Sequence, residues 1–377
     1  MIFIRIFFSF LFLISVINIF AKEKIIPNHN FGLDASYQIG KVFKHTKNFQ
    51  PTITGATNVF QISAFKQTNG KKDWQRKLKY PELGGGFIAL LHHNSDTIGN
   101  GYAAFAYFTY PFVRSRFVDF ILRFSGGFAY DSNVYDEQSN PVNNAMASPI
   151  NIFVEARLGL NFKIYKNVEL ITGIAFAHYS SGGTRLPNLG LNTPTFLLGL
   201  RYIGISKKAT PFNTDPVEKS QYKNELGFLL NTGWSDITKF DKDKSHIITS
   251  GSVQYARYFN IVNKLYCGAL LEFDFGQPHL QENRLLVQDK LIKKAASRMS
   301  IYVGNEIAFG RTSIFYALGV YLFTPYKMFT PIYFKIGTNI NFLALGKKNR
   351  PYFNFGVKAH AGIASYTEIG LGSNFKY

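Results

Sequence analysis

INIFVEARLGLNF, residues 150–162, alternates between apolar residues and polar or small ones. Successive residues of a β-strand point to opposite faces, so this alternation predicts a strand with one apolar and one polar face. Strands of soluble proteins typically have only about 5–6 residues, and long alternating strands are typical of barrels that cross a membrane. The apolar face comprises Ile150, Ile152, Val154, Ala156, Leu158, Leu160 and Phe162, and the opposite face is dominated by Asn151, Glu155, Arg157, Gly159 and Asn161.

The same alternation recurs as far as the last residue. The final strand places Ile369, Leu371, Phe375 and Tyr377 on one face, and a chain that ends on such an aromatic residue resembles outer-membrane barrels. The pattern predicts sixteen strands, at residues 33–43, 57–66, 83–93, 99–110, 116–130, 149–163, 167–180, 192–206, 222–235, 245–260, 264–276, 297–309, 312–325, 328–343, 350–361 and 366–377.

The N-terminal residues have the layout of a secretory signal peptide. Arg5 precedes an apolar run that ends at Phe20, and the small residue Ala21 comes just before Lys22. We expect residues 1–21 to be removed, which leaves residues 22–377 as the mature chain. No later stretch approaches the roughly 20 consecutive apolar residues that a spanning helix needs. A mature chain in a membrane would therefore cross it as strands.

The composition also suits an exported barrel. The chain has 38 Phe and 22 Tyr residues, spread in alternation with Gly, Asn, Lys and Asp, and its single cysteine, Cys267, excludes an intrachain disulfide. A net charge of +19 would suggest a nucleic-acid partner. Export argues against that partner. A basic outer surface would instead suit anionic lipid headgroups, and the solubility of loops and turns is the alternative explanation.

Together these features predict an all-β fold in which residues 22–377 form a single antiparallel transmembrane β-barrel of about 14–16 strands. If both termini are periplasmic, most long connections lie outside, at 44–56, 131–148, 181–191, 236–244 and 277–296. Two connections, 67–82 and 207–221, are longer than this arrangement predicts for the periplasmic side. By strand parity, Glu155, Arg157 and Arg201 face the lumen, where ion pairs would fill the barrel.

The segment most specific for function begins with GIAFAHYSSGG at residue 173 and ends at Gly204. His178 has the parity of the apolar residues before it, so it and Ser180 should face lipid, where polar groups are costly. Residues i and i+2 lie about 6.6 Å apart on one face of a strand. His178 can therefore reach the Ser180 hydroxyl, take its proton and activate it as a nucleophile. The loop that follows adds possible oxyanion donors at Gly182, Gly183, Asn188 and Gly190.

The run HYS followed by PNLGLN resembles the lipid A 3-O-deacylases and the wider acyloxyacyl-hydrolase-like group of outer-membrane proteins, most strongly over residues 170–204. The resemblance implies that His178 is the general base, Ser180 the nucleophile and Asn188 an oxyanion donor, on the outer face of a barrel where lipid A chains lie. Well-known members have a Glu twelve residues after the Ser, and this chain has Asn192 there. Asn192 lacks the charge, but an amide can orient an imidazole, as in papain-like enzymes.

Two functions are compatible with these observations. The first is an outer-membrane esterase that removes an ester-linked acyl chain from lipid A in the outer leaflet, with no cofactor and no metal. Its partners would be lipopolysaccharide acyl chains and the outer membrane, not nucleic acid, and no oligomeric state is indicated. The second is a non-catalytic barrel, a channel or a structural protein, that retains the motif. Known deacylase barrels are much shorter, so activity alone leaves half of the chain without an explanation.

Overall fold

The computed structural model describes residues 31–204, 212–217, 222–236, 245–276, 297–324, 330–343 and 348–377. The predicted signal peptide and the predicted connection 277–296 lie outside the described residues, as does most of the predicted connection 236–244. No helix in the described ranges is long and apolar enough to span a membrane.

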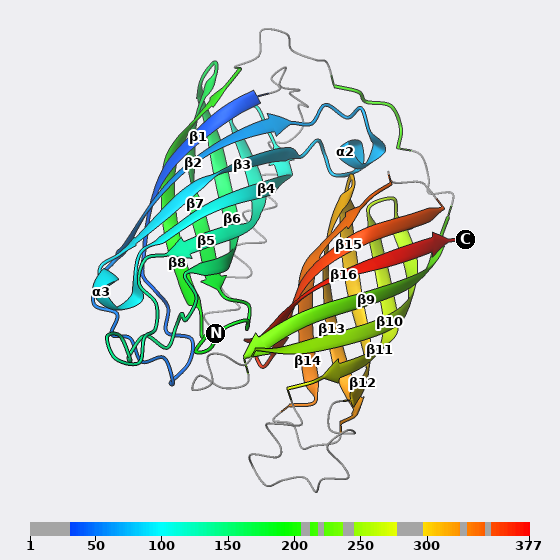
Figure 1. Ribbon diagram of the computed structural model, residues 1–377. Helices are drawn as coiled ribbons and strands as arrows, with labels where there is room; N and C mark the ends of the chain where they lie inside the picture. The colour runs from blue at the N-terminus through cyan, green and yellow to red at the C-terminus, as the bar shows by residue number, and fades with distance from the viewer. Residues whose placement is uncertain are drawn as a thin grey trace, which may run out of the picture. The chain divides into compact units, whose positions relative to one another are not determined.

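The chain folds into two closed antiparallel β-barrels of eight strands each, coloured blue to green and light green to red in Figure 1. The first contains β1 (Phe31–Gly40), β2 (Thr57–Gln67), β3 (Glu82–His92), β4 (Gly101–Arg114), β5 (Val118–Asp131), β6 (Ile150–Tyr165), β7 (Val168–Ser180) and β8 (Leu191–Ile203). The second contains β9 (Asn224–Asp236), β10 (Ser245–Asn260), β11 (Asn263–Asp274), β12 (Ser297–Phe309), β13 (Thr312–Phe323), β14 (Ile332–Asn341), β15 (Asn349–His360) and β16 (Ile363–Lys376).

The prediction of a single barrel is wrong, although all sixteen predicted strands are present. β1 pairs with β8, with Ser36 opposite Gly199, and this pairing closes the first barrel. β16 pairs with β9, with Gly370 opposite Asn231, and this closes the second. Alternation shows which face each residue occupies, but both kinds of closure have the same alternation. One large barrel and two small ones both leave no strand edge unpaired, and backbone groups in a bilayer must all be hydrogen-bonded within the protein.

Both barrels are apolar outside and polar inside. On β8, Phe196 and Leu198 point outward and are 72% and 58% exposed, whereas Thr195, which precedes Phe196, is buried. On β9, Leu230 is 71% exposed and Glu225 is fully buried. Lipid can accept such an outer face, and only the interior can accept such polar residues.

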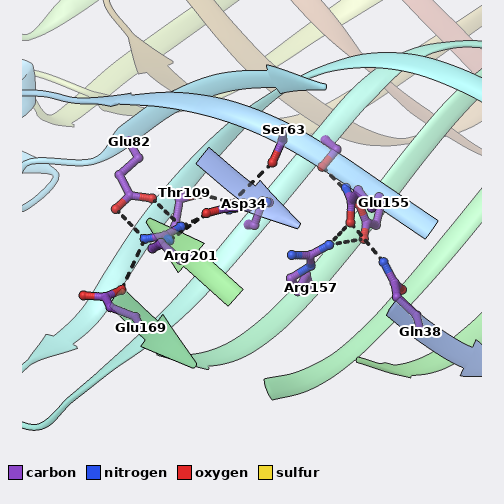
Figure 2. Close-up of polar contacts among 12 residues, drawn as sticks. Asp34, Gln38, Ser63, Glu82, Thr109, Glu155, Arg157, Glu169 and Arg201 are labelled. Atoms are coloured by element: carbon purple, nitrogen blue, oxygen red, sulfur yellow. Dashed lines mark hydrogen bonds and ion pairs between the residues drawn. The ribbon is translucent and has the colours of Figure 1, made fainter. Parts of the chain in front are cut away.

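Buried ion pairs cross the interior of the first barrel (Figure 2). Asp34 on β1 accepts hydrogen bonds from Arg123 at 2.6 Å and from Arg201 at 2.8 Å. Arg201 also donates to Glu82 at 3.0 Å. Arg157 pairs with its neighbour Glu155 at 3.3 Å. The predicted lumenal positions of Glu155, Arg157 and Arg201, and the prediction that ion pairs fill this barrel, are confirmed.

The second barrel has a charged interior of its own. Lys264 on β11 pairs with Glu225 on β9, and lies 3.1 Å from a carboxylate oxygen of Glu306 on β12. Lys358 on β15 donates to Glu272 on β11 at 2.6 Å. Burying a charge is costly unless an opposite charge compensates it, and these pairs supply that compensation between strands of the barrel.

The connections of the first barrel separate into two groups. One end carries the longer connections 41–56, 93–100, 132–149 and 181–190, and the other carries 68–81, 115–117 and 166–167. Short helices lie in two of them, α2 (Asp73–Lys77) and α3 (Ser95–Ile98). At the first end, Val42, Phe49 and Ala145 are buried, and Asn144 Nδ2 donates to the Asn48 carbonyl at 2.6 Å. These connections therefore form an ordered layer at the end of the barrel where β7 stops.

Candidate active site

The hairpin of β7 and β8 carries the predicted site residues. Ile174 and Phe176 of β7 point outward and are about half exposed, whereas Ala177 and Tyr179 are buried inside the barrel. His178 has the outward parity of Ile174 and Phe176 and is partly buried. Ser180, the last residue of β7, has the same parity but is only 6% exposed. The prediction that this face of β7 is the outer one is confirmed. The hydrogen bond predicted between His178 and Ser180 stays a prediction.

Asn192 lies directly across the ladder from His178. The next pair of the ladder is Tyr179 with Leu191, so the 181–190 connection leaves the sheet directly after these residues. His178 Nδ1 lies 2.7 Å from Asn192 Oδ1. An amide oxygen only accepts hydrogen bonds, so Nδ1 carries the proton and donates it. The other ring nitrogen, Nε2, is then the unprotonated one and has the lone pair that a general base needs.

Tyr179, the residue between His178 and Ser180, anchors the end of β7. Its side chain is fully buried inside the barrel, and its hydroxyl lies 2.8 Å from His92 Nε2 on β3. His92 Nδ1 in turn lies 2.9 Å from Thr57 Oγ1 on β2. Because Tyr179 is fixed from the inside, the backbone that presents His178 and Ser180 on the outside is fixed as well.

The connection from β7 to β8 supplies hydrogen-bond donors beside Ser180. The Gly182 N–H donates to Ser180 Oγ at 3.4 Å, and the Ser181 N–H donates to Asn188 Oδ1 at 2.9 Å. The second bond holds the Asn188 side chain next to the peptide that follows Ser180. Among the described residues, Asn188 Nδ2 is buried and has no hydrogen-bond partner. A buried donor of this kind costs about 1–3 kcal/mol unless something accepts from it, so it calls for an explanation.

A residue that the sequence did not single out joins the site from the 41–56 connection. Asn192 Nδ2 lies 2.8 Å from His45 Nδ1. The two residues are 147 positions apart, so no local spacing connects them. Only closure of the barrel, which pairs β1 with β8, brings His45 to this hairpin.

Within the described part of the chain, no group of three or more His, Cys, Asp or Glu side chains is arranged to hold a metal ion. The side chains gathered at this site are the hydroxyl of Ser180, the imidazole of His178 with its hydrogen bond to Asn192, and the amide of Asn188.

Comparison with known families gives one match to the first barrel from β2 to β8 and another to the whole of the second. Residues 58–201 match the family model of lipid A 3-O-deacylase (PagL). Residues 224–377, from the start of β9 to the last residue, match the model of the acyloxyacyl hydrolase C-terminal domain. The fold is that of an outer-membrane β-barrel protein. The chain belongs to the lipid A 3-O-deacylase and acyloxyacyl-hydrolase-like family of outer-membrane proteins.

Solved structures similar to this chain include the outer-membrane enzyme PagL, which is 16% identical in sequence. That match covers 44% of this chain and 97% of the enzyme, with a TM-score of 0.32. A triple mutant of the porin from Rhodopseudomonas blastica is 11% identical, and the match covers 92% of this chain and 100% of the porin with a TM-score of 0.18. The comparison with curated proteins gives no match.

Proposed function

We propose that the protein is an outer-membrane esterase that removes an ester-linked acyl chain from lipid A. The observation that carries the proposal is the hydrogen bond from His178 to Asn192 on the outer face of the barrel, two residues before Ser180. This arrangement gives a nucleophile, a base with a defined tautomer and a group that orients the base. Membership of the lipid A 3-O-deacylase family supports the substrate.

The reaction would proceed through a covalent acyl-enzyme. Ser180 Oγ attacks the ester carbonyl carbon while His178 Nε2 takes the hydroxyl proton. When the tetrahedral intermediate collapses, the C–O bond to the sugar breaks and the imidazolium returns that proton to the sugar oxygen. Water, deprotonated by the same imidazole, then attacks the acyl-enzyme. This second half releases the fatty acid and restores Ser180.

Asn188 is suited to stabilise the negative charge that develops on the carbonyl oxygen. Its Oδ1 is occupied by the Ser181 N–H, so its Nδ2 is held beside Ser180. A substrate oxyanion would give this buried donor an acceptor. Donors that are in place before the charge forms need no reorganisation during the reaction, which is why such groups accelerate acyl transfer.

The position of the site favours a lipid over a soluble ester. Below His178 on the same face of β7 lie Phe176 and Ile174, both exposed, and β8 continues the apolar surface. Acyl chains of the outer leaflet would contact this surface and bring their ester ends to the level of His178. The channel function is less well supported, because buried ion pairs cross the interior of the first barrel (Figure 2).

The experiment that tests the proposal measures free fatty acid released from vesicles that contain lipid A and the purified full-length protein. Ser180→Ala should reduce release by at least about a thousandfold, as expected when a nucleophile is removed. Ser139→Ala, at an exposed serine of the 132–149 connection, is the matched control and should release fatty acid at the native rate. Release that is unaffected by Ser180→Ala would contradict the proposal.

A further inference from the structure

The amide of Asn192 faces two histidines at once. Its Oδ1 accepts from His178 Nδ1 at 2.7 Å, and its Nδ2 lies 2.8 Å from His45 Nδ1. An amide nitrogen only donates, so His45 Nδ1 must accept and cannot carry a proton. The three side chains thus form one directed chain of hydrogen bonds, from His178 through Asn192 to His45.

An asparagine in this position has a problem that a carboxylate does not have. A carboxylate presents an acceptor to His178 whichever way it turns. An amide that turns over presents its N–H groups instead, and His178 Nδ1 would then have to accept. Its proton would move to Nε2, and the imidazole would lose the lone pair that takes the Ser180 proton. Activity with Asn192 therefore requires something that fixes which end of the amide faces His178.

We propose that His45 is this positioning residue: its Nδ1 lone pair holds the Asn192 amide with Oδ1 toward His178. The inference rests on the proposed function and concerns only how that site works with an amide as its orienting group. His45 would not contact the substrate. It acts on the reaction through the tautomer of His178.

The 41–56 connection is built to hold His45 in place. The Phe43 N–H donates to the Asn192 carbonyl at 2.8 Å, so the connection is tied to the same residue by its backbone. Val42 and Phe49 are buried on either side, and the His45 ring lies edge-on to Phe49 with 6.2 Å between ring centroids. His45 itself is exposed, so its replacement removes little beyond this ring contact and the hydrogen bond to Asn192.

The test replaces His45 by residues that differ in what they offer to Asn192. Gln can accept from the amide N–H, Ala offers nothing, and Lys can only donate. With Asn192 present, kcat should be near the native value for His45→Gln, reduced a few-fold for His45→Ala, and reduced by about tenfold or more for His45→Lys, since a donor at this point favours the inverted amide. KM should change little, because His45 acts in this proposal through Asn192 and not through the substrate.

The same three replacements are then made together with Asn192→Glu. A carboxylate accepts on both sides, so Lys at position 45 becomes a favourable donor, and Gln can turn its NH2 group toward the carboxylate. His45→Lys should therefore lose its disadvantage and be at least as active as His45→Gln. A merely structural role for His45 predicts the same order in both series. His93→Lys, at an exposed histidine of the 93–100 connection, is the control and should leave kcat unchanged in both.

A second measurement does not depend on turnover. The ¹⁵N chemical shifts of His178 should show the proton on Nδ1 in the native protein and on Nε2 in His45→Lys. The inference is overturned if the order of the His45 variants is the same with Asn192 and with Glu, or if His178 keeps its tautomer in His45→Lys. Activity that survives Ser180→Ala would instead overturn the proposed function, and this inference with it.

Discussion

At the scale of single residues, four residues of the site lie on the β7–β8 hairpin, and a fifth, His45, reaches the site only because the barrel closes. His178, Ser180, Asn188 and Asn192 could be named from the sequence because a short motif on neighbouring strands contains them all. His45 could not be named, since it is brought to Asn192 by the pairing of β1 with β8 and lies in a connection without a recognisable pattern. The roles assigned to the four motif residues stay predictions until variants are assayed.

The isosteric replacement Asn188→Asp tests the oxyanion donor without changing the shape of the loop. The new carboxylate still accepts from the Ser181 N–H, which holds the loop, but it removes the Nδ2 donor. We expect kcat to fall by about 10²–10³-fold, the usual effect of removing one oxyanion donor, while the folded fraction stays at the native level. Kinetics on lipid A vesicles and electrophoretic mobility of the unheated protein measure the two quantities. Native kcat in Asn188→Asp would remove Asn188 from the mechanism.

At the scale of strands, the alternation of apolar and polar residues was enough to predict where most strands begin and end. The predicted strand 297–309 has the bounds of β12, and the predicted 57–66 differs from β2 by one residue, because each strand must keep an apolar face toward lipid. Alternation does not determine how two strands are aligned across a loop. The β7–β8 ladder pairs His178 with Asn192, and the alignment depends on where the 181–190 connection leaves the sheet.

Because the apolar face of β8 is expected to contact lipid, a charged residue placed on that face should strongly destabilise the protein. Leu198→Arg, in the middle of β8, should lower the free energy of unfolding by about 2–4 kcal/mol, the cost of an arginine at the bilayer midplane. Val142→Arg is the matched control, because Val142 is similarly exposed but lies in the 132–149 connection. Denaturant unfolding of both variants in lipid vesicles measures the difference. Equal stability of the two variants would mean that this face of β8 does not meet lipid.

At the scale of the molecule, the sixteen strands agree with the prediction, and the number of barrels they form does not. The connection 207–221 was longer than a periplasmic turn should be, and it proves to fall between the two closed barrels. Two eight-strand barrels and one sixteen-strand barrel have the same alternating faces, and the other long connection, 67–82, joins β2 to β3 within the first barrel. Neither alternation nor connection length therefore distinguishes the two architectures. The second barrel explains the half of the chain that the deacylase motif does not reach, and it matches a family model of its own.

Independent closure of the barrels can be tested by cutting between them. A protease site inserted between Asp215 and Pro216 interrupts no strand pair. After cleavage, both fragments should migrate as folded, heat-modifiable barrels, because β1 pairs with β8 and β16 with β9. The uncut protein with the inserted site is the control. If either fragment unfolds on cleavage, strands of the two halves are paired with each other, as a single large barrel would require.

The proposed reaction is hydrolysis of an acyl ester of lipid A with the Ser180 hydroxyl as nucleophile. Mass spectrometry of lipid A from cells that produce the native protein, the Ser180→Ala variant or neither protein tests it most directly. We expect lipid A lighter by one acyl chain only with the native protein, and lipid A of unchanged mass with Ser180→Ala at equal abundance in the outer membrane. Lipid A of the same mass in all three would contradict it, as would loss of the acyl chain in cells that produce Ser180→Ala.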